Sequence, residues 1–311
     1  MSTEDAHRPV LLNEAVDALA VETGGIYVDG TFGRGGHSRQ ILKRLGVEGK
    51  LLVLDRDPEA HVASLALAQA DSRVKAHRAA FSSLERIAAE AGVRGRVNGV
   101  LLDIGVSSAQ LDDPRRGFSF IRSGPLDMRM DPTAGESAAA WLMRATEKDI
   151  ATVIHEYGEE RHARRIARAI VAARTETPFS DTLQLAELVS RAVPRHDRFK
   201  HPATRTFQAI RIFINNELEE LGSCLGQCLR VLAPAGRLVV ISFHSLEDRM
   251  VKRFMRDHAR LAMPDPKAPW LEPVGRPLLR IIGKAVLPNE TEVAANPRAR
   301  SAVLRVAEKM P

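Results

Sequence analysis

The sequence has little cysteine: its 311 residues include only Cys224 and Cys228. A small scaffold held together by disulfides needs several cysteines, so that class of protein is excluded. The two residues lie four positions apart in the helical-looking segment 216–232, where both face one side of a helix as small core residues. No cluster of His or Asp residues stands beside them to complete a coordination shell, so we expect no zinc site.

Long apolar runs are also missing. No window approaches the roughly 18 uninterrupted apolar residues of a membrane span. The first residues, MSTEDAHRPVLLNE, have neither the basic end nor the apolar stretch of a signal peptide. With 44% hydrophobic residues the chain can bury one large core or two modest ones. We therefore expect a globular cytoplasmic protein with no membrane partner.

The charge is unevenly distributed. The formal net charge is +6, and residues 191–211 hold six cations against one acid, Asp197. Such a cluster favours a polyanionic partner, although a solvated helix face is the alternative. The cations are Arg191, Arg195, Arg198, Lys200, Arg205 and Arg211.

The order of apolar and helical patterns predicts an α/β fold. Up to residue 105, strand patterns at 25–30, 50–55, 73–79 and 97–105 alternate with helical ones, which indicates a parallel sheet covered on both faces. Residues 106–132 have no period, and helical patterns without strands follow, ending in a long helix at 204–232. Strand patterns resume at 237–243. This order predicts a Rossmann-like open sheet with an inserted all-helical domain, residues 112–205, between the segments 1–111 and 206–311 of the sheet domain.

A glycine cluster, YVDGTFGRGGHS at residues 27–38, occupies the turn after the first strand, where ligands bind in such sheets. A triphosphate-binding loop would need Lys and Ser or Thr after Gly35, but Gly36 and His37 follow. The dinucleotide pattern would need a third glycine at Ser38, so it is only partly matched. Adenosine without a pyrophosphate remains.

Two acids end neighbouring strands. Asp55 ends the second strand, about 20 residues after the glycines, where an acid can accept hydrogen bonds from a ribose diol. NAD and S-adenosylmethionine share this feature. Asp103 ends the fourth strand, as is common in methyltransferases of this fold, although an acid there can also cap a helix or loop.

Several long segments resemble the bacterial 16S ribosomal RNA (cytosine N4)-methyltransferase family, and they span almost the whole chain. The resemblance implies a class I methyltransferase fold, S-adenosylmethionine as methyl donor, and a cytosine in the decoding region of 16S ribosomal RNA as acceptor, in naked RNA or in the small ribosomal subunit. The segments are HRPVLLNEAVDAL, YVDGTFGRGGHS, LDRDPEA, LLDIGVSSAQLDDPRRGFSF, GPLDMRMDP, YGEERHARRIARAI, FKHPATRTFQAIRIFIN and ISFHSLEDRMVKRFM.

The resemblance also implies site residues for the donor. By themselves, His37 could simply open a helix, Phe81 could be a core residue, and Gln110 carries no signal. The implied donor-binding residues are Gly35, Gly36, His37, Asp55, Phe81, Asp103 and Gln110.

Catalysis by methyl transfer mainly requires alignment of donor and acceptor atoms. The cytosine amine is a poor nucleophile, and an acceptor for its N–H would help it react; Asp103 is the nearest candidate. Amino-methyltransferases acting on DNA carry a Pro-Pro-aromatic string after this position, but Ile104, Gly105 and Val106 follow here, so the clamp for the base is not identified. His244 is expected to bond a loop rather than to catalyse, with Ser245 and Asp248 capping the next helix.

The segment after the inserted helices is the expected RNA contact. Arg198, Lys200 and Arg205 could neutralise phosphates, and Phe199 or Phe207 could stack a base. The arginines 161, 164, 165 and 168 could serve solubility alone. Two other functions stay open: a non-catalytic RNA-binding assembly factor with a vestigial donor pocket, and an NAD-dependent oxidoreductase, which Ser38 disfavours.

Overall fold

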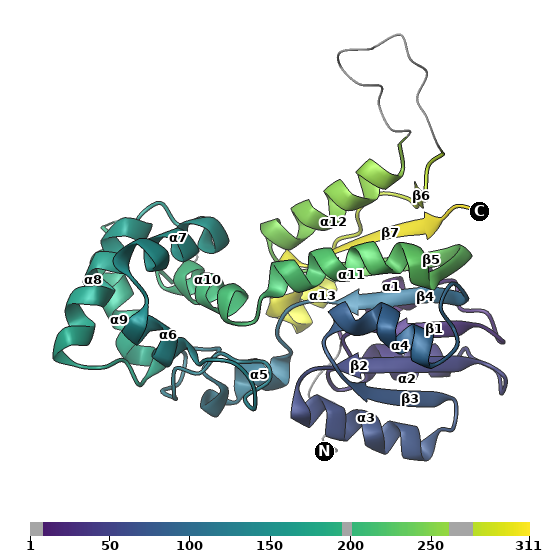
Figure 1. Ribbon diagram of the computed structural model, residues 1–311, viewed down its shortest axis with the longest axis horizontal. Helices are drawn as coiled ribbons and strands as arrows, with labels where there is room; N and C mark the ends of the chain where they lie inside the picture. Colours follow the sequence, from purple (N-terminus) through teal and green to yellow (C-terminus); the bar gives the residue numbers. More distant parts are fainter. Residues whose placement is uncertain (1–8, 195–200, 261–275) are drawn as a thin grey trace, which may run out of the picture. The chain divides into compact units, whose positions relative to one another are not determined.

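The computed structural model describes residues 9–194, 201–260 and 276–311 (Figure 1). It divides into two compact units, Met1–Gly105 with Leu218–Pro311, and Val106–Glu217. Both predicted boundaries, after residues 111 and 205, fall inside the second of these units. Within the described ranges, no helix is long and apolar enough to cross a membrane.

The first unit is built on a seven-stranded sheet of order β3-β2-β1-β4-β5-β7-β6. The first five strands in this order run parallel, β7 is antiparallel to β5, and β6 is antiparallel to β7. The chain crosses from β3 over to β4, so the strand order reverses between β1 and β4, the usual ligand position in open sheets. The strands are β1 (Ile26–Asp29), β2 (Lys50–Asp55), β3 (Val74–Arg78), β4 (Val97–Asp103), β5 (Leu232–Ser242), β6 (Leu279–Ile281) and β7 (Val303–Lys309).

This arrangement is the class I methyltransferase fold, which confirms the predicted fold class. Helices and short 3₁₀ turns fill the connections between strands, as in other sheets of parallel strands. The helices of this unit are α1 (Leu12–Ala18), α2 (Gly36–Leu42), α3 (Pro58–Ala70), α4 (Leu84–Glu90), α11 (Glu217–Val231), α12 (Ser245–His258) and α13 (Glu290–Ala295), and one 3₁₀ turn, η2 (Phe81–Ser83), precedes α4.

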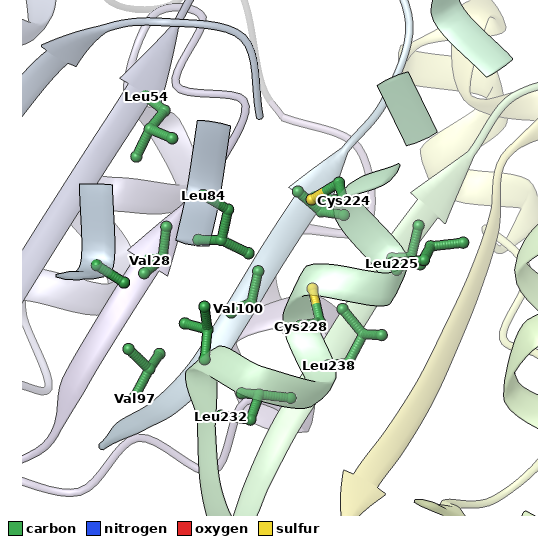
Figure 2. Close-up of a cluster of buried hydrophobic side chains, with 14 of the residues drawn as sticks. Val28, Leu54, Leu84, Val97, Val100, Cys224, Leu225, Cys228, Leu232 and Leu238 are labelled. Carbon is green, nitrogen blue, oxygen red and sulfur yellow. The ribbon is translucent and has the colours of Figure 1, made fainter. Parts of the chain in front are cut away.

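Alternation along the strands divides the apolar residues of the sheet between two cores, because successive side chains point to opposite faces. Leu52 and Leu54 of β2 pack with α4 and α11, while Leu51 and Val53 pack with α1 and α2. Figure 2 shows the first core, where Cys224 and Cys228 of α11 lie among Val100 and other strand residues. Both cysteines are fully buried and form no disulfide, as predicted for small core residues.

The second unit has its own core, made by helices. Its centre is lined by apolar residues of α7, α8 and α9, among them Ile154, Ile166 and Leu185, all fully buried. The helices are α5 (Ser108–Asp112), α6 (Ala138–Arg144), α7 (Glu147–Gly158), α8 (Ala163–Glu176), α9 (Thr182–Ala192) and α10 (Thr204–Ile214), with a 3₁₀ turn, η3 (Pro114–Arg116).

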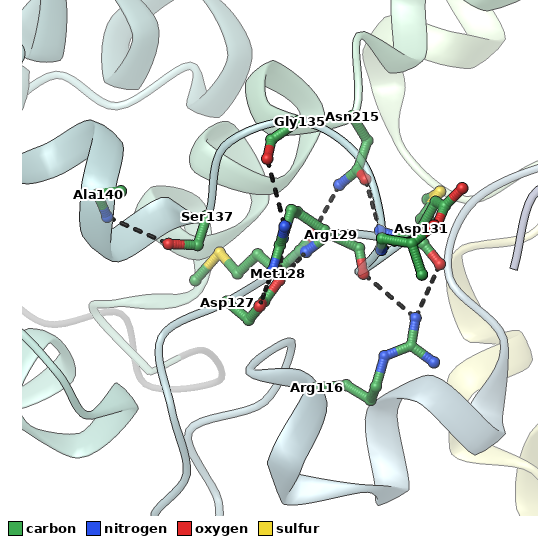
Figure 3. A network of polar contacts seen from close by, with 11 residues as sticks. Arg116, Asp127, Met128, Arg129, Asp131, Gly135, Ser137, Ala140 and Asn215 are labelled. Carbon is green, nitrogen blue, oxygen red and sulfur yellow. Dashed lines mark hydrogen bonds and ion pairs between the residues drawn. The ribbon is translucent and has the colours of Figure 1, made fainter. Parts of the chain in front are cut away.

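The single long helix predicted for residues 204–232 is wrong. The chain leaves the helix after Ile214, and Asn216 has a left-handed backbone with φ of 51°. The side chain of Asn215 accepts a hydrogen bond from Met130 N at 2.7 Å and donates one to Met128 O at 2.7 Å. The break therefore depends on partners from a distant loop (Figure 3).

That loop, predicted as aperiodic, is tightly held although it has little regular structure. Arg116 is buried and donates to the carbonyl oxygens of Arg129 and Met130, while Arg129 forms a two-pronged ion pair with Asp127 (Figure 3). Met128 is fully buried with a left-handed φ of 63°. Polar contacts thus hold the backbone where no helix or strand does.

Candidate functional site

Acidic side chains stand at the carboxyl edge of the sheet in the first unit. Asp29, Asp55 and Asp103 are the last residues of β1, β2 and β4, which are adjacent parallel strands. Because parallel strands end on the same edge, these side chains converge on the point where the strand order reverses. The structure therefore brings together the predicted Asp55 and Asp103.

The loop between β1 and α2 is rich in glycine, and at two of its positions the neighbouring side chains leave no room for a Cβ atom. Gly33 and Gly35 have left-handed backbones, with φ of 56° and 75°. A Cβ atom on Gly35 would lie 2.6 Å from the Phe32 ring, and one on Gly36 would lie 2.0 Å from Pro9. Any side chain at either position would force the neighbouring groups to move, which explains why glycine stands at both positions.

Asp55 fastens this loop to β2. Its carboxylate accepts hydrogen bonds from Gly33 N at 2.8 Å and from Asp57 N at 2.9 Å. Burial raises the pKa of Asp55 to about 6, and these two bonds oppose the shift. Each oxygen accepts one bond and has a further lone pair, so the side chain can still receive the two hydroxyls of a ribose.

Sequence reasoning missed the role of Asp29. Its carboxylate is 1% exposed and accepts bonds from Ser38 Oγ at 2.6 Å and Thr31 N at 3.1 Å. Burial raises the pKa of Asp29 to about 6. Thr31 Oγ1 in turn accepts a bond from Asp103 N at 2.7 Å, so the glycine turn is connected to the end of β4. Two features of the sequence point to Asp29. It is an acid directly before Gly30, and its partner Ser38 stands where a dinucleotide site would have glycine.

Of the three acids at this edge, Asp103 has the most strongly shifted pKa. Its side chain is 23% exposed, but Oδ1 is buried and has no hydrogen-bond partner among the described residues. Burial, followed by the nearby charges of Asp29 and Glu247, raises the pKa of Asp103 to about 8. An unsatisfied buried acceptor is costly unless a ligand supplies a donor, which makes Oδ1 a candidate contact atom.

His37 lies in the first turn of α2, beside this acid. The residue is 5% exposed, its Nδ1 is 3.7 Å from Asp103 Oδ2, and its Nε2 is 3.2 Å from the Val10 carbonyl oxygen. It therefore does more than open a helix, because its ring connects the segment before α1 to the end of β4.

Phe81 lies at the same edge, after β3. It is half-buried in η2 and packs against the core below α4. A Cβ atom on Gly30 would lie 3.4 Å from the Phe81 Cβ, which places Phe81 beside the glycine turn. A partly exposed ring at this position can cover an adenine.

Gln110 belongs to the second unit. It is 6% exposed and forms a reciprocal cap at the start of α5, where its Oε1 accepts a bond from Ser107 N at 2.8 Å. Its contribution to the donor site stays a prediction.

The predicted capping pair of Ser245 and Asp248 is wrong: His244, which was expected to bond a loop, caps α12 itself. His244 itself precedes α12 and pairs with Glu247, whose carboxylate accepts bonds from Phe243 N and His244 N. Asp248 instead forms an ion pair with Arg305 of β7. The histidine ring replaces Ser245 in the cap because its Nδ1 accepts from Glu247 N.

The residues predicted to contact RNA differ in outcome. Arg198 and Lys200 lie outside the described residues. Arg205 is exposed and donates to the Glu159 carbonyl oxygen at 3.0 Å. The arginines 161, 164, 165 and 168 are exposed on α8 or just before it, and the last lies 3.7 Å from Glu147.

The structure contradicts the expectation that Phe207 stacks a base. It is 4% exposed in the core of the second unit, where its ring meets Phe120 edge-on at a centroid distance of 4.7 Å. A ring enclosed in this way has no open face for a base. The helical period of α10 turns this residue inward, away from the exposed side that carries Arg205.

The residues of the edge fit a nucleoside ligand that carries a positive charge. Open space beside Gly33 allows close approach to the main chain, and Asp55 can bind a ribose. Asp103 Oδ1, which has no hydrogen-bond partner among the described residues, offers a buried acceptor near other acids. S-adenosylmethionine fits these residues, since it combines an adenosine, which carries the ribose, with a sulfonium cation.

Comparison with known proteins identifies the family. The model of the MraW methylase family matches residues 4–310. The chain is 59% identical over 306 residues to "Ribosomal RNA small subunit methyltransferase H" of Thioalkalivibrio sulfidiphilus, covering 98% of both chains. It is 56% identical over 305 residues to the protein of the same name from Nitrosococcus oceani, covering 98% of this chain and 97% of the other.

Among solved structures, the chain is similar to an rRNA methylase from Streptococcus thermophilus, with a TM-score of 0.43 and 10% identity over 98% of this chain and 99% of the other. The assignment rests on the family match and the two close relatives. The chain therefore belongs to the MraW methylase family, a family of methyltransferases that use S-adenosylmethionine.

Proposed function

We propose that the chain methylates the exocyclic N4 amine of a cytosine in the decoding region of 16S ribosomal RNA, within the small ribosomal subunit. The observation that carries the proposal is the buried Oδ1 of Asp103 at the carboxyl edge of the sheet, which has no hydrogen-bond partner in the part of the chain that the structure describes. An acceptor at this position suits an amine that must lose a proton. The printed name of the two close relatives supports ribosomal RNA of the small subunit as substrate.

The residues of the first unit have separate roles in this proposal. S-adenosylmethionine, when bound, supplies a methyl group that its sulfonium charge has already activated. Asp55 accepts hydrogen bonds from the ribose, the backbone of Gly35 and Gly36 lies against the ligand, and Phe81 covers the adenine. Asp103 accepts the N–H of the cytosine amine, which gives the nitrogen back its lone pair and holds it in line for transfer.

Residues 112–205, which lie within the second unit, are proposed as the domain that recognises RNA. Arg198, Lys200 and Arg205 would each neutralise a phosphate, and Gln110 would complete the donor site. The exposed position of Arg205 suits this role, since its guanidinium can contact phosphate while it keeps its bond to Glu159.

The substrate assignment can be tested in a deletion strain. Ribosomal RNA from this strain should lack one methyl group on a decoding-region cytosine, as read by mass analysis of RNA fragments. Complementation with the wild-type gene should restore the methyl group, while Asp103→Asn should not, although the variant keeps its fold. Unchanged RNA in the deletion strain would contradict the substrate, and full restoration by Asp103→Asn would contradict the role of Asp103.

The RNA contact can be tested through salt dependence. Changing Arg198, Lys200 and Arg205 together to Ala should flatten the plot of log affinity against log salt by roughly 0.7 to 0.9 for each lost phosphate contact. Donor affinity should not change. The matched control changes Arg161, Arg164 and Arg165 to Ala, which removes equal charge from exposed residues at the start of α8. If only the control flattens the slope, the RNA lies on that surface instead.

A further inference from the structure

One helix of the first unit carries a row of cations. On α12, four basic residues stand at positions i, i+3, i+4 and i+7, the spacing that places side chains on one face of a helix. All four are exposed. We call this face the basic stripe, and its residues are Arg249, Lys252, Arg253 and Arg256.

The opposite face of α12 packs on the sheet. Val251 and Met255 are buried in the core that α11 shares, and the partly buried Met250 and Phe254 pack beside them. The helix is therefore amphipathic, and the basic stripe lies opposite the residues that attach it to the sheet. Because this apolar face anchors α12, the stripe is not needed to hold the helix in place.

The middle of the stripe has no ion pair in the part of the chain that the structure describes. Lys252 and Arg253 have neither a salt bridge nor a hydrogen bond to any described residue. Of the acids of α12, Glu247 is buried and Asp248 forms an ion pair with β7. Asp257 pairs with the last residue of the stripe at 2.8 Å. The stripe therefore presents uncompensated positive charge to its surroundings.

This charge pattern works against the stability of the helix. Like charges three and four positions apart on a helix repel each other, and the helix dipole favours cations only in the last turn. Of the stripe, that turn holds Arg256. The dipole therefore does not account for Arg249, Lys252 and Arg253, and a helix that keeps them on an exposed face is suited to an anionic partner.

The start of α12 lies at the edge of the sheet that carries the acceptor. In β5, Ile241 pairs with Asp103 at the end of β4, and α12 begins a few residues later, at Ser245. Glu247, in the first turn, is close enough for its charge to raise the pKa of Asp103. From this edge α12 runs beside β6 and β7 (Figure 1). The stripe thus begins near the proposed methylation site and leads away from it.

The length of the stripe suits a short piece of an RNA strand. Arg249 and Arg256 are seven positions apart, which corresponds to about 10 Å along the helix. Stacked nucleotides of one strand are about 3.4 Å apart, so about three phosphates fit within this length. Arginine, which supplies most of the stripe, binds phosphate oxygens in pairs through its planar group. An acidic protein would also be attracted, but the stripe begins where the substrate must enter, which favours RNA.

We propose that the basic stripe of α12 is a second RNA contact, which binds the phosphates next to the target cytosine. This inference rests on the proposed function. It gives the first unit a share in substrate binding, in addition to donor binding and methyl transfer, while residues 112–205 bind another part of the RNA.

A triple variant removes most of the stripe and keeps the helix. Glutamine favours helices about as well as Lys and Arg do, and the loss of repulsion should leave the protein at least as stable as the wild type. The control removes equal charge from exposed lysines at the other end of the strands and of α2. The triple variant is Lys252→Gln, Arg253→Gln and Arg256→Gln, and the control is Lys43→Gln, Lys50→Gln and Lys75→Gln.

The first measurement is filter binding of 16S ribosomal RNA across a salt series. The triple variant should flatten the plot of log affinity against log salt by roughly 0.7 for each lost contact, which is about 2 in total. The affinity lost through the variant should therefore shrink about 20-fold between 50 and 200 mM salt. The control should keep the wild-type slope, and both variants should keep the affinity for S-adenosylhomocysteine.

The second measurement is methylation of small ribosomal subunits. In the triple variant, KM for the subunit should rise while kcat stays near the wild-type value, because the stripe binds the substrate without touching the reacting atoms. If the triple variant does not fold, Lys252→Glu decides the question, since an acid four residues before Arg256 favours the helix. This single variant should flatten the salt slope by at least about 0.7.

Several results would overturn the proposal. These are an unchanged salt slope in the folded variant, equal flattening in the triple variant and the control, or a fall in kcat with KM unchanged. A wild type that binds no ribosomal RNA would contradict the proposed function itself, whereas a wild type that binds RNA and a variant that binds it equally well would contradict the role of the stripe.

Discussion

Changing Asp55 to Asn should remove a loss of stability that the wild type suffers as the pH rises, while weakening the binding of the donor. Asn has the shape of a protonated aspartic acid and stays neutral at every pH, and its amide nitrogen cannot accept one of the two main-chain hydrogen bonds that Asp55 receives. The pKa of Asp55 is raised from 3.8 to about 6, chiefly by burial. Ionised Asp55 therefore costs the folded state about 3 kcal/mol relative to the neutral form, at 1.36 kcal/mol per pKa unit.

The sign of this effect gives it a recognisable pH dependence. The stability that the neutral carboxyl contributes is fully present below pH 3.8 and is lost as the pH rises through about 6. The lost hydrogen bond costs the variant a constant amount, so the free energy of unfolding of Asp55→Asn minus that of the wild type should rise by up to about 3 kcal/mol between about pH 4 and pH 7. Urea unfolding of the cofactor-free proteins across this range measures the difference.

Donor binding should move in the opposite direction. A ribose hydroxyl that loses its charged acceptor costs about 1 to 3 kcal/mol, which weakens binding roughly 5- to 150-fold. Calorimetry with S-adenosylhomocysteine measures this affinity. Glu59→Gln is the control, because it removes a half-exposed carboxylate from α3, close along the chain. A stability difference that does not change with pH would refute the account of burial, and an unchanged affinity would refute the contact with ribose.

Three further predictions concern other parts of the molecule. Because the pKa of Asp103 is raised to about 8, the ionised acid should attract the sulfonium more strongly as the pH rises. The ratio of the affinities for S-adenosylmethionine and S-adenosylhomocysteine, measured by calorimetry, should therefore rise between about pH 6 and pH 9 in the wild type and stay constant in Asp103→Asn. A constant ratio in the wild type would contradict this. Phe207→Ala should lower the free energy of unfolding, measured with urea, by about 3 to 5 kcal/mol and leave the RNA affinity of the folded protein, measured by filter binding, unchanged. Unchanged stability with weaker RNA binding would instead show that Phe207 contacts RNA. Asn215→Ala removes the partners of Met128 O and Met130 N, so trypsin should cut faster at the exposed Arg122, and equal cleavage rates would show that other contacts hold the loop.

Local patterns in the sequence determined the elements and the position of the site. The alternation of strand and helix patterns up to residue 105 predicted the parallel strands, because that spacing leaves no other simple arrangement. The acids Asp55 and Asp103 could be placed together for the same reason, since parallel strands end at one edge. The burial of Cys224 and Cys228 followed from their spacing of one helical turn.

The tertiary structure decided everything that depends on a partner distant in sequence. The break at Asn215 needs the main chain of Met128 and Met130, and helical periodicity continues through this position without a sign of them. Phe207 stands in a cationic segment, yet α10 turns its ring into the core. Likewise, the raised pKa of Asp103 comes from burial and from Asp29 and Glu247, which are distant along the chain. Hydrogen bonds, packing and burial act through space, so composition and spacing can indicate which residues form the site but not how each is held or charged there.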